Sequence, residues 1–413
     1  MTTEIRPILS ALMRSKTGAI LVAVQVALSL AILANALHIV TVRQAVAARP
    51  SGVAAEHEVF NLLARHMRPA SHNEQLALQK RQAAVLRAVP GVVSVAQTSQ
   101  IPMSRSGSTS GLAASRSEQR NTVPTAVYIT PDSLIKTWGL RLVEGRDFTP
   151  AEITEIDQTV TQEFPPQIII TRALADKLHP GGGSMLTQPV FMGTGENAQR
   201  LQVVGVVERL QTQGAEVGGR GEYAMLTPVR LTGDSDTLFT VRAEAGQRDR
   251  AMKDAEQAIR AASPGDVIVR VRPLDEDRDK RYRADRALSW MLITVSALLL
   301  LVTASGIVGI ASLWVTQRRK QIGVRRALGA RRIDILRYFL TENFMITTAG
   351  VGAGVLLALA LNQLLVSQLE MARLPAGYLL AGVLVFWLLG LCAVIGPAWR
   401  AASISPATAT RST

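Results

Sequence analysis

The chain has 413 residues, which is enough for two or three domains, with 48% hydrophobic residues and a formal net charge of +13. A charge of this size is typical of proteins that bind nucleic acid or an anionic membrane surface. Residues 43–286 carry nearly balanced charge, and the basic excess lies in short segments beside hydrophobic runs, as in cytoplasmic membrane loops. Aromatic residues are few, which argues against a nucleic-acid stacking surface. A single cysteine, Cys392, excludes disulfide stabilisation and a cysteine-based metal site.

The first uncharged run, residues 17–42, is long enough to cross about 30 Å of hydrocarbon as a helix. Basic residues precede it, so residues 1–16 are expected in the cytoplasm. A cleaved signal peptide is the alternative, since residues 45–48 are small and would suit a cleavage site. The run is long for a signal sequence and contains Asn35 and His38, so a transmembrane helix is the better interpretation.

The stretch that follows, residues 43–286, has the pattern of a mixed α+β domain. Its first part, to about residue 68, is predicted to continue the first helix. Ser71 and Glu74 fit a capping box that starts a second helix. The strands are predicted at 91–97, 122–130, 139–145, 167–171, 200–211, 223–229, 237–243 and 267–271, the helices at 131–138, 172–179, 249–262 and 275–285, and a Ser/Gly-rich loop at 100–119. Two subdomains are compatible with this order, with the second inserted after Gly145 and a boundary near 145–235.

Several basic residues precede the second hydrophobic run. Acidic residues are interleaved with them, so a self-compensated helix face is the better interpretation, with lipid headgroups or partner acids as the alternative. These basic residues are Arg270, Arg272, Arg278, Lys280, Arg281 and Arg283.

Three more uncharged runs follow, at residues 287–316, 343–366 and 377–398. If the N-terminus is cytoplasmic, the positive-inside rule places the basic segments inside and the balanced domain outside. The sequence therefore predicts a membrane protein with four transmembrane α-helices plus one large external α+β periplasmic domain between helices 1 and 2. The connector 317–342 and the tail 399–413 would be cytoplasmic, and the short loop 367–376 periplasmic.

The connector between the second and third runs, residues 317–342, is the most unusual segment. It is strongly basic, with only Asp334 and Glu342 as acids, and apolar residues interrupt the charge. This pattern predicts a short amphipathic segment at the membrane surface that presents a helix to another protein. Gly329 is predicted to end one helix so that the next starts at Arg331.

No pattern of side chains indicates catalysis. His57 and His66 lie near acidic residues, but a solvated helix face explains them better than a metal site. The glycine-rich segments at 181–183 and 193–198 lack the Lys-Ser/Thr of a phosphate loop, and turns explain them better. We therefore expect no catalytic, cofactor or metal site in this chain, and any ATP-driven activity would need a separate ATPase.

Two C-terminal segments carry a family resemblance. The connector QRRKQIGVRRALGARRIDILRYFLTEN and the closing GPAWRAASISPATATR resemble the permease of MacB/FtsX-type (type VII) ABC transporters. The external segments AVYITPDSLIKTWGLRLVEGRDF, IIITRALADKLHPGGG and LQVVGVVERL resemble the MacB-like periplasmic core domain of that family. The resemblance implies a dimer of permeases in the bacterial inner membrane, each bound to a cytoplasmic ABC ATPase that holds ATP and magnesium.

The resemblance also implies which residues contact the ATPase. Mechanotransmission is expected, in which ATP-driven motion passes through the membrane to the periplasmic domain. The alternative is that the arginines of the connector 317–342 only set the orientation of the chain in the membrane and bind anionic lipid headgroups. Carried onto this sequence, the ATPase-coupling residues are Ile322, Gly323, Arg325, Arg326, Leu328, Gly329, Ala330, Arg331, Arg332 and Ile333.

Two departures from the family pattern bear on the assembly. Gln317 and Gln321 stand where the family often has glutamate, and the chain lacks the ATPase that is fused to macrolide-exporter permeases. These departures leave open a heterodimer with a second permease as well as a homodimer. A periplasmic adaptor protein is a further expected partner.

The resulting functional hypothesis is the permease subunit of an ABC exporter or extruder, with efflux of antibiotics, peptides, lipids or lipoproteins as the expected role. The alternative is a non-transporting signal transmitter that activates a cell-wall hydrolase or a sensor in the periplasm. A sensor receptor is a weaker alternative, since no cytoplasmic segment is long enough to fold as an output domain.

Overall fold

The computed structural model describes residues 16–116, 122–161, 163–193, 195–263, 265–369 and 373–403. The chain divides into a helical unit, Met1–Gln44 with Asp285–Thr413, and an external unit, Ala45–Ala284. These limits differ by two residues at each end from the predicted domain 43–286. Residues 1–15 of the predicted N-terminal segment 1–16, and parts of the loop 367–376 and the tail 399–413, lie outside the described residues.

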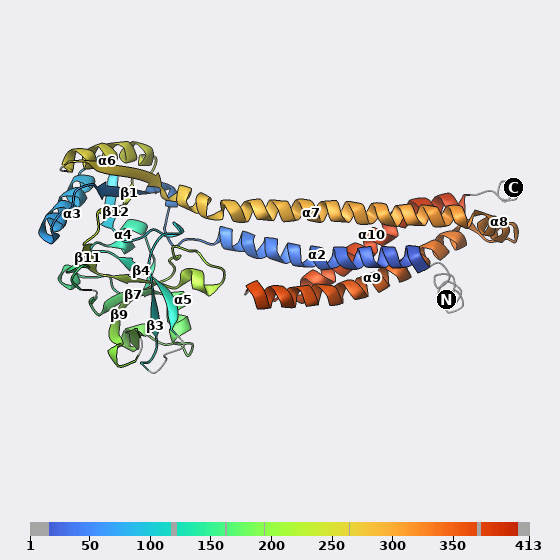
Figure 1. Cartoon of the computed structure of the whole chain (residues 1–413), viewed down its shortest axis with the longest axis horizontal. Coiled ribbons are helices and arrows are strands. Elements are labelled where there is room, and N and C mark those ends of the chain that lie inside the picture. Colours follow the sequence, from blue (N-terminus) through green and yellow to red (C-terminus); the bar gives the residue numbers. More distant parts are fainter. Residues whose placement is uncertain are drawn as a thin grey trace. The chain divides into compact units, whose positions relative to one another are not determined.

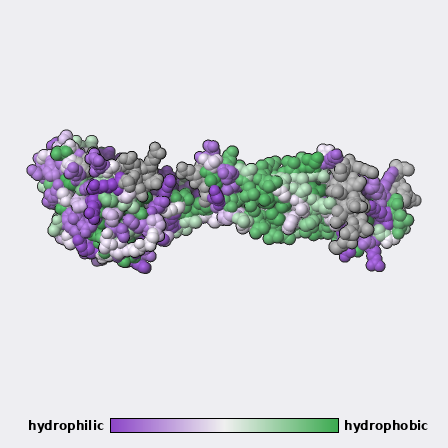
Figure 2. Space-filling model, turned by 90° about the horizontal axis from the view of Figure 1, so that it is seen from below, coloured by the Kyte–Doolittle hydropathy of each residue, from purple (hydrophilic) through white to green (hydrophobic). Residues whose placement is uncertain are grey.

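Among the described residues, four helices are long and apolar enough to cross a membrane (Figure 1). Each contains one of the predicted uncharged runs, and Figure 2 shows a mostly hydrophobic surface over these helices. The four-span prediction is therefore confirmed. The helices are α2 (Lys16–Ala48), α7 (Leu274–Gln317), α9 (Arg332–Leu369) and α10 (Ala376–Ala402).

Helix α2 is the central helix of the helical unit. Over its most apolar window 56% is buried, against 17–33% in the other three spans. Gly350 and Gly354 of α9 face α2, and a Cβ atom added to Gly350 would lie 2.8 Å from the carbonyl oxygen of Ala23. The small residues of the third predicted run therefore permit close contact between two helices in lipid.

Polar side chains also join the helices. The hydroxyl groups of Ser29 and Thr303 lie 2.8 Å apart, between α2 and α7. The Nδ2 of Asn35 in α2 donates to the carbonyl oxygen of Ala358 in α9 at 3.1 Å. Because buried polar groups have no water in the hydrocarbon region, these hydrogen bonds favour one rotational setting of each helix.

The external unit contains an antiparallel sheet, which we call sheet A, in the order β13-β1-β12-β2. Helices α3 and α6 cover one of its faces and bury Phe60, Leu62 and Phe239 beneath them. The capping box of α3 is confirmed, since the Glu74 carboxylate accepts from the backbone N–H of Ser71 at 2.8 Å. The elements are β1 (Val59–His66), α3 (His72–Arg87), β2 (Val92–Gln97), β12 (Asp236–Ala243), α6 (Arg248–Ala262) and β13 (Val267–Pro273).

The chain between β2 and β12 forms a second sheet that closes on itself, which we call the barrel. Strand β9 pairs with β7 on one edge and with both β8 and β5 on the other, so the order β9-β7-β10-β4-β3-β8 returns to β9. Strands β6 and β11 pair separately in parallel. The elements are β3 (Thr109–Ala113), β4 (Val123–Ile129), α4 (Leu134–Trp138), β5 (Leu142–Gly145), β6 (Thr154–Asp157), β7 (Gln167–Thr171), α5 (Arg172–Leu178), β8 (Pro189–Met192), β9 (Gln199–Val207), β10 (Ala224–Thr227) and β11 (Val229–Thr232).

The predicted continuation of the first helix to residue 68 is wrong. Helix α2 ends at Ala48, and strand β1 begins at Val59. Pro50 disfavours a helical conformation in the residue before it, and Gly52 has φ +95°. A Cβ atom at Gly52 would lie 2.2 Å from the carbonyl oxygen of Arg209, so the turn after α2 requires glycine.

The predicted boundary of the inserted subdomain near residue 145 also differs from the structure. Since sheet A contains β2 and β12, the inserted barrel begins after Gln97 and ends before Asp236. The predicted strand 223–229 is divided at Pro228 into β10 and β11, which pair in different sheets. Strands β6 and β8 were not predicted, and the predicted loop 100–119 contains β3, while its residues 117–119 lie outside the described residues.

Candidate functional site

The connector folds as the predicted helix–turn–helix. Helix α8 (Arg319–Ala327) is followed by Gly329 at φ +101°, and α9 begins at Arg332. The N–H of Ala330 donates to the carbonyl oxygen of Arg325 at 3.1 Å, the bond of a glycine-terminated helix end. The Asp334 carboxylate accepts from the N–H of Arg331 at 2.9 Å and caps α9. Backbone geometry thus fixes the turn between the two helices.

One side of α8 packs into its own chain. Ile322 is only 5% exposed and belongs to the same core as Ile335 and Phe339 of α9. Gly323 is also buried. These two residues, predicted to contact the ATPase, therefore face inward and position the connector.

A buried ion pair lies at the start of the connector. The Arg318 guanidinium donates to the two carboxylate oxygens of Glu342 at 2.9 and 2.7 Å. The Glu342 side chain is 1% exposed and that of Arg318 is 17% exposed. Two buried charges this close stabilise each other, while removal of one partner leaves the other uncompensated. The pair joins the end of α7 to α9, and sequence reasoning did not predict it.

Arg326 also forms a hydrogen bond with another helix of its own chain. Its Nη1 donates to the carbonyl oxygen of Ala402, in the last turn of α10, at 2.9 Å. A cation at the C-terminal end of a helix satisfies a free carbonyl and interacts favourably with the helix dipole. Arg326 therefore connects α8 to α10.

The opposite side of the connector is exposed, and we call it the connector face. Leu328 is 83% exposed, Val324 54% and Ile333 46%. Arg325 is exposed, with its guanidinium carbon 5.0 Å from the centroid of the Tyr338 ring, and Gly329 lies in the exposed turn. Apolar side chains beside exposed arginines are typical of a protein-binding surface. The connector face comprises Val324, Arg325, Leu328, Gly329, Arg331, Arg332 and Ile333, while the predicted contact residue Ala330 is half-buried beside it.

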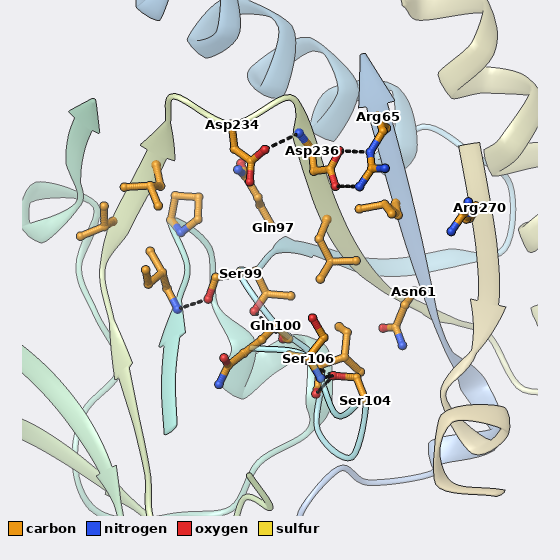
Figure 3. A pocket seen from close by; sticks show the side chains of 18 of the residues that line it. Asn61, Arg65, Gln97, Ser99, Gln100, Ser104, Ser106, Asp234, Asp236 and Arg270 are labelled. Atoms are coloured by element: carbon orange, nitrogen blue, oxygen red, sulfur yellow. Dashed lines mark hydrogen bonds and ion pairs between the residues drawn. The ribbon is translucent and has the colours of Figure 1, made fainter. Parts of the chain in front are cut away.

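A second candidate site is a cavity of about 480 Å³ within the external unit (Figure 3). One wall is the face of sheet A opposite its helices, and the other includes residues 97–101 and strand β11. No local pattern in the chain indicates this cavity, because strand pairing brings its walls together from distant segments. The sheet A wall contains Asn61, Leu63, Arg65, Asp236, Leu238, Arg270 and Arg272.

The charged groups of the cavity differ in their pairing. Arg65 donates to both carboxylate oxygens of Asp236, at 2.6 and 2.5 Å, and this hydrogen bonding lowers the pKa of Asp236. Arg270 and Arg272 belong to β13 and not to the charged helix, so the self-compensated helix face does not account for them. On the helix itself, Lys280 pairs with Glu276 one turn away, as the prediction expects, whereas Arg278 pairs with Glu56 outside the helix.

The acids near His57 and His66 have arginine partners. Glu56 accepts from the Arg278 guanidinium at 2.7 Å, and Glu58 accepts from that of Arg242 at 3.1 Å. His66 lies in β1, where its ring nitrogen contacts the side-chain amide of Gln82 at 3.1 Å. The residues belong to a 3-10 turn and a strand, so the predicted solvated helix face is wrong, and the acids serve ion pairs.

Comparison with protein families identifies both halves of the chain. The model described as the MacB-like periplasmic core domain matches residues 21–273, and the FtsX-like permease C-terminal model matches residues 293–406. The chain belongs to the MacB/FtsX-like family of ABC transporter permeases. This assignment confirms the resemblance of the external segments and of the connector. The connector face lies within the FtsX-like match, and the sheet A wall of the cavity lies within the MacB-like match.

Several curated proteins are similar to this permease. The pyoverdine export ATP-binding/permease protein PvdT of Pseudomonas savastanoi pv. phaseolicola is 32% identical over 224 residues, covering 51% of this chain and 33% of the relative. The macrolide export ATP-binding/permease protein MacB of Nitrosomonas europaea is 27% identical over 298 residues, covering 68% and 41%. The uncharacterized ABC transporter permease YvrN of Bacillus subtilis is 26% identical over 299 residues, covering 69% of each chain. The chain thus spans less than half the length of the two export proteins.

Two solved structures match about half of this chain. The extracellular domain of the ABC-type transporter YknZ from Gram-positive bacteria is 17% identical with a TM-score of 0.33, covering 51% of this chain and 99% of that one. A domain of a permease protein from Porphyromonas gingivalis is 14% identical with a TM-score of 0.34, covering 54% and 92%.

Proposed function

We propose that this permease is the membrane subunit of an ABC-type exporter and that it transmits ATP-driven motion of a separate cytoplasmic ATPase to its periplasmic domain. The observation that supports the proposal most strongly is the connector face, where Leu328 and Ile333 are exposed beside Arg331 and Arg332. An ATPase surface with an apolar groove and acidic edges would complement it in shape and charge. ATP and magnesium would bind to that ATPase, and this chain would supply the mechanical response.

The inward side of the connector supplies a way to pass on motion. Arg318 bonds to Glu342 on α9, and Arg326 bonds to the last turn of α10. Because leaving one partner of a buried ion pair uncompensated is costly, the pair should stay together, and a push on the connector should move these helices with it. Helices α2 and α7 each run through the sequence limit between the helical and external units, so the proposal assigns the transfer of motion to them.

The proposal includes an orientation and an assembly. The connector and both termini would lie in the cytoplasm of a bacterial inner membrane, with the external unit in the periplasm, as the distribution of basic residues supports. Two permease copies would form the transporter, either identical or different, together with a periplasmic adaptor. The PvdT and MacB relatives are named as exporters of pyoverdine and macrolides, which supports export of a small molecule.

The proposal is tested with the ATPase that co-purifies with the tagged permease from its native membrane. The pair is reconstituted in nanodiscs, and the permease-stimulated ATP hydrolysis is measured. The variant Leu328→Ala with Arg331→Glu and Arg332→Glu should lower the stimulation at least tenfold, because it removes an apolar contact and reverses two charges of the connector face. All three residues are exposed, so the variant should still fold.

The matched control carries Arg250→Glu and Lys253→Glu, which make the same charge change on exposed residues of α6. This control should stimulate hydrolysis like the wild type. Full stimulation by the connector variant, or failure of any ATPase to co-purify under several mild conditions, would refute the proposal.

A further inference from the structure

The cavity in the external unit contains a buried acceptor without a donor. Asn61 of β1 is 5% exposed and lines the cavity, and its side chain points toward the opposite wall in Figure 3. Its Nδ2 donates to the Asp277 carboxylate at 3.2 Å, while Oδ1 is buried and accepts no hydrogen bond from any residue that the structure describes. Buried polar atoms are nearly always hydrogen-bonded, so Oδ1 favours a ligand that brings an N–H or O–H.

Two exposed arginines lie on the same face as this acceptor. Arg272 is directly opposite Asn61 in the pairing of β13 with β1, and Arg270 is opposite Leu63, so all four side chains share one face. Within the described part of the chain, neither guanidinium makes a direct hydrogen bond or ion pair, while the charge of Arg272 acts on Asp277 and that of Arg270 acts on Asp236. Arg65, farther along the same face, is already held by Asp236. Guanidinium groups suit the two oxygens of a carboxylate, so a wall with two arginines can bind an anion.

The two ends of the cavity wall favour different ligand groups. Asp277 lies beside Asn61, which favours a donor at that end and repels an anion. Arg270 lies farther from Asp277 along β13, so an anionic group is favoured there. Apolar side chains lie between and opposite these groups, namely Leu63, Leu238, Ile101, Ile129 and Leu231. A volume of about 480 Å³ lies within the range of small-molecule sites.

We propose that this cavity binds the carboxyl end of a short peptide-like molecule with an apolar side chain. The carboxylate contacts Arg270, at the end of the wall away from Asp277, the adjacent N–H donates to Oδ1 of Asn61, and the side chain lies against Leu63 and Leu238. The assignment of this ligand as a transported substrate rests on the proposed export function, whereas its binding does not.

Binding is measured on the full-length permease in nanodiscs, without ATPase or nucleotide, by fluorescence titration. The probes are N-dansyl-glycyl-leucine as the free acid and as its carboxamide. The acid should bind saturably, and the carboxamide at least tenfold more weakly. The variant Arg270→Gln with Arg272→Gln should weaken binding of the acid at least tenfold, and Asn61→Leu about fivefold, while thermal unfolding reports that each variant is folded.

The matched control is Arg250→Gln with Lys253→Gln, which removes the same charge from α6, on the other face of sheet A. It should bind both probes like the wild type. Equal binding of acid and carboxamide, equal loss in the control, absence of saturable binding, or displacement of the probe by inorganic phosphate at equal concentration would overturn the proposal. Because no ATPase is present, these outcomes are independent of whether the connector couples to one.

Discussion

Arg318 and Glu342 are separated by 24 residues and by the whole connector, yet the Arg318 Nη1 lies 2.7 Å from a carboxylate oxygen of Glu342. Arg318 lies between the end of α7 and the start of α8, and Glu342 lies in α9. Glu342 is almost fully buried and Arg318 largely so, so neither charge is compensated by water. The connector is therefore held at its base by electrostatics as well as by the packing of Ile322.

We predict that Glu342→Gln destabilises the helical unit by about 3 kcal/mol, because it leaves the Arg318 charge buried without its partner. Thermal unfolding in detergent measures this effect. The control is Glu256→Gln, which breaks an exposed i,i+4 pair with Arg260 and should cost less than about 0.5 kcal/mol. Similar small effects for both substitutions would show that the buried pair has no special role.

The two sides of the connector should respond differently to truncation. Ile322→Ala removes a buried side chain and should destabilise the protein by about 2–4 kcal/mol. Leu328→Ala removes an exposed side chain, so stability should change by less than about 0.5 kcal/mol while stimulated ATP hydrolysis falls several-fold. Unfolding and hydrolysis are measured on the same preparations. Loss of stability in Leu328→Ala would indicate that this residue packs within the chain.

The parts of the fold that were predicted from sequence are those that depend on residues close to one another along the chain. An uncharged run long enough to span a bilayer identifies a membrane helix without knowledge of its contacts, and the capping box of Ser71 and Glu74 is local too. The turn at Gly329 follows from one residue that tolerates a positive φ. These predictions were confirmed because each depends on a short stretch of the chain.

The parts that were missed depend on pairing between distant segments. The apolar sequence of β1 fits either a helix or a strand, and its partners β12 and β13 follow more than 160 residues later. The barrel begins directly after β2, but only the pairing of β12 with β2 shows this. The cavity has the same origin, since the register of β13 on β1 is what brings Arg272 beside Asn61.

Close packing of α9 on α2 gives a third prediction. Gly350→Ala should destabilise the helical unit by about 1–3 kcal/mol, because the added Cβ lies 2.8 Å from the Ala23 carbonyl oxygen and 3.0 Å from the Val26 side chain. The matched control is Gly352→Ala in the same helix, where an added Cβ meets nothing described within 4 Å. This control should be neutral or stabilise by up to about 1 kcal/mol through helix propensity. Thermal unfolding of both variants in one detergent separates packing from propensity, and equal effects would contradict the close contact.

The stability of the external unit should depend on pH through the carboxylate of Glu152. Hydrogen bonds from Arg146, at 2.8 and 2.6 Å, and from Thr149 lower the pKa of Glu152 from 4.5 to about 2. Since the folded pKa is the lower one, the ionised carboxylate stabilises the fold above about pH 4.5, and this contribution is lost as the pH falls toward 2. Wild type should therefore unfold at a higher temperature than Glu152→Gln at pH 6, with the difference shrinking between pH 4.5 and 2. Arg146→Gln should show the same convergence, because it removes the main partner of the carboxylate. A difference that stays constant down to pH 2 would mean that Glu152 stabilises the turn by packing and not by its charge.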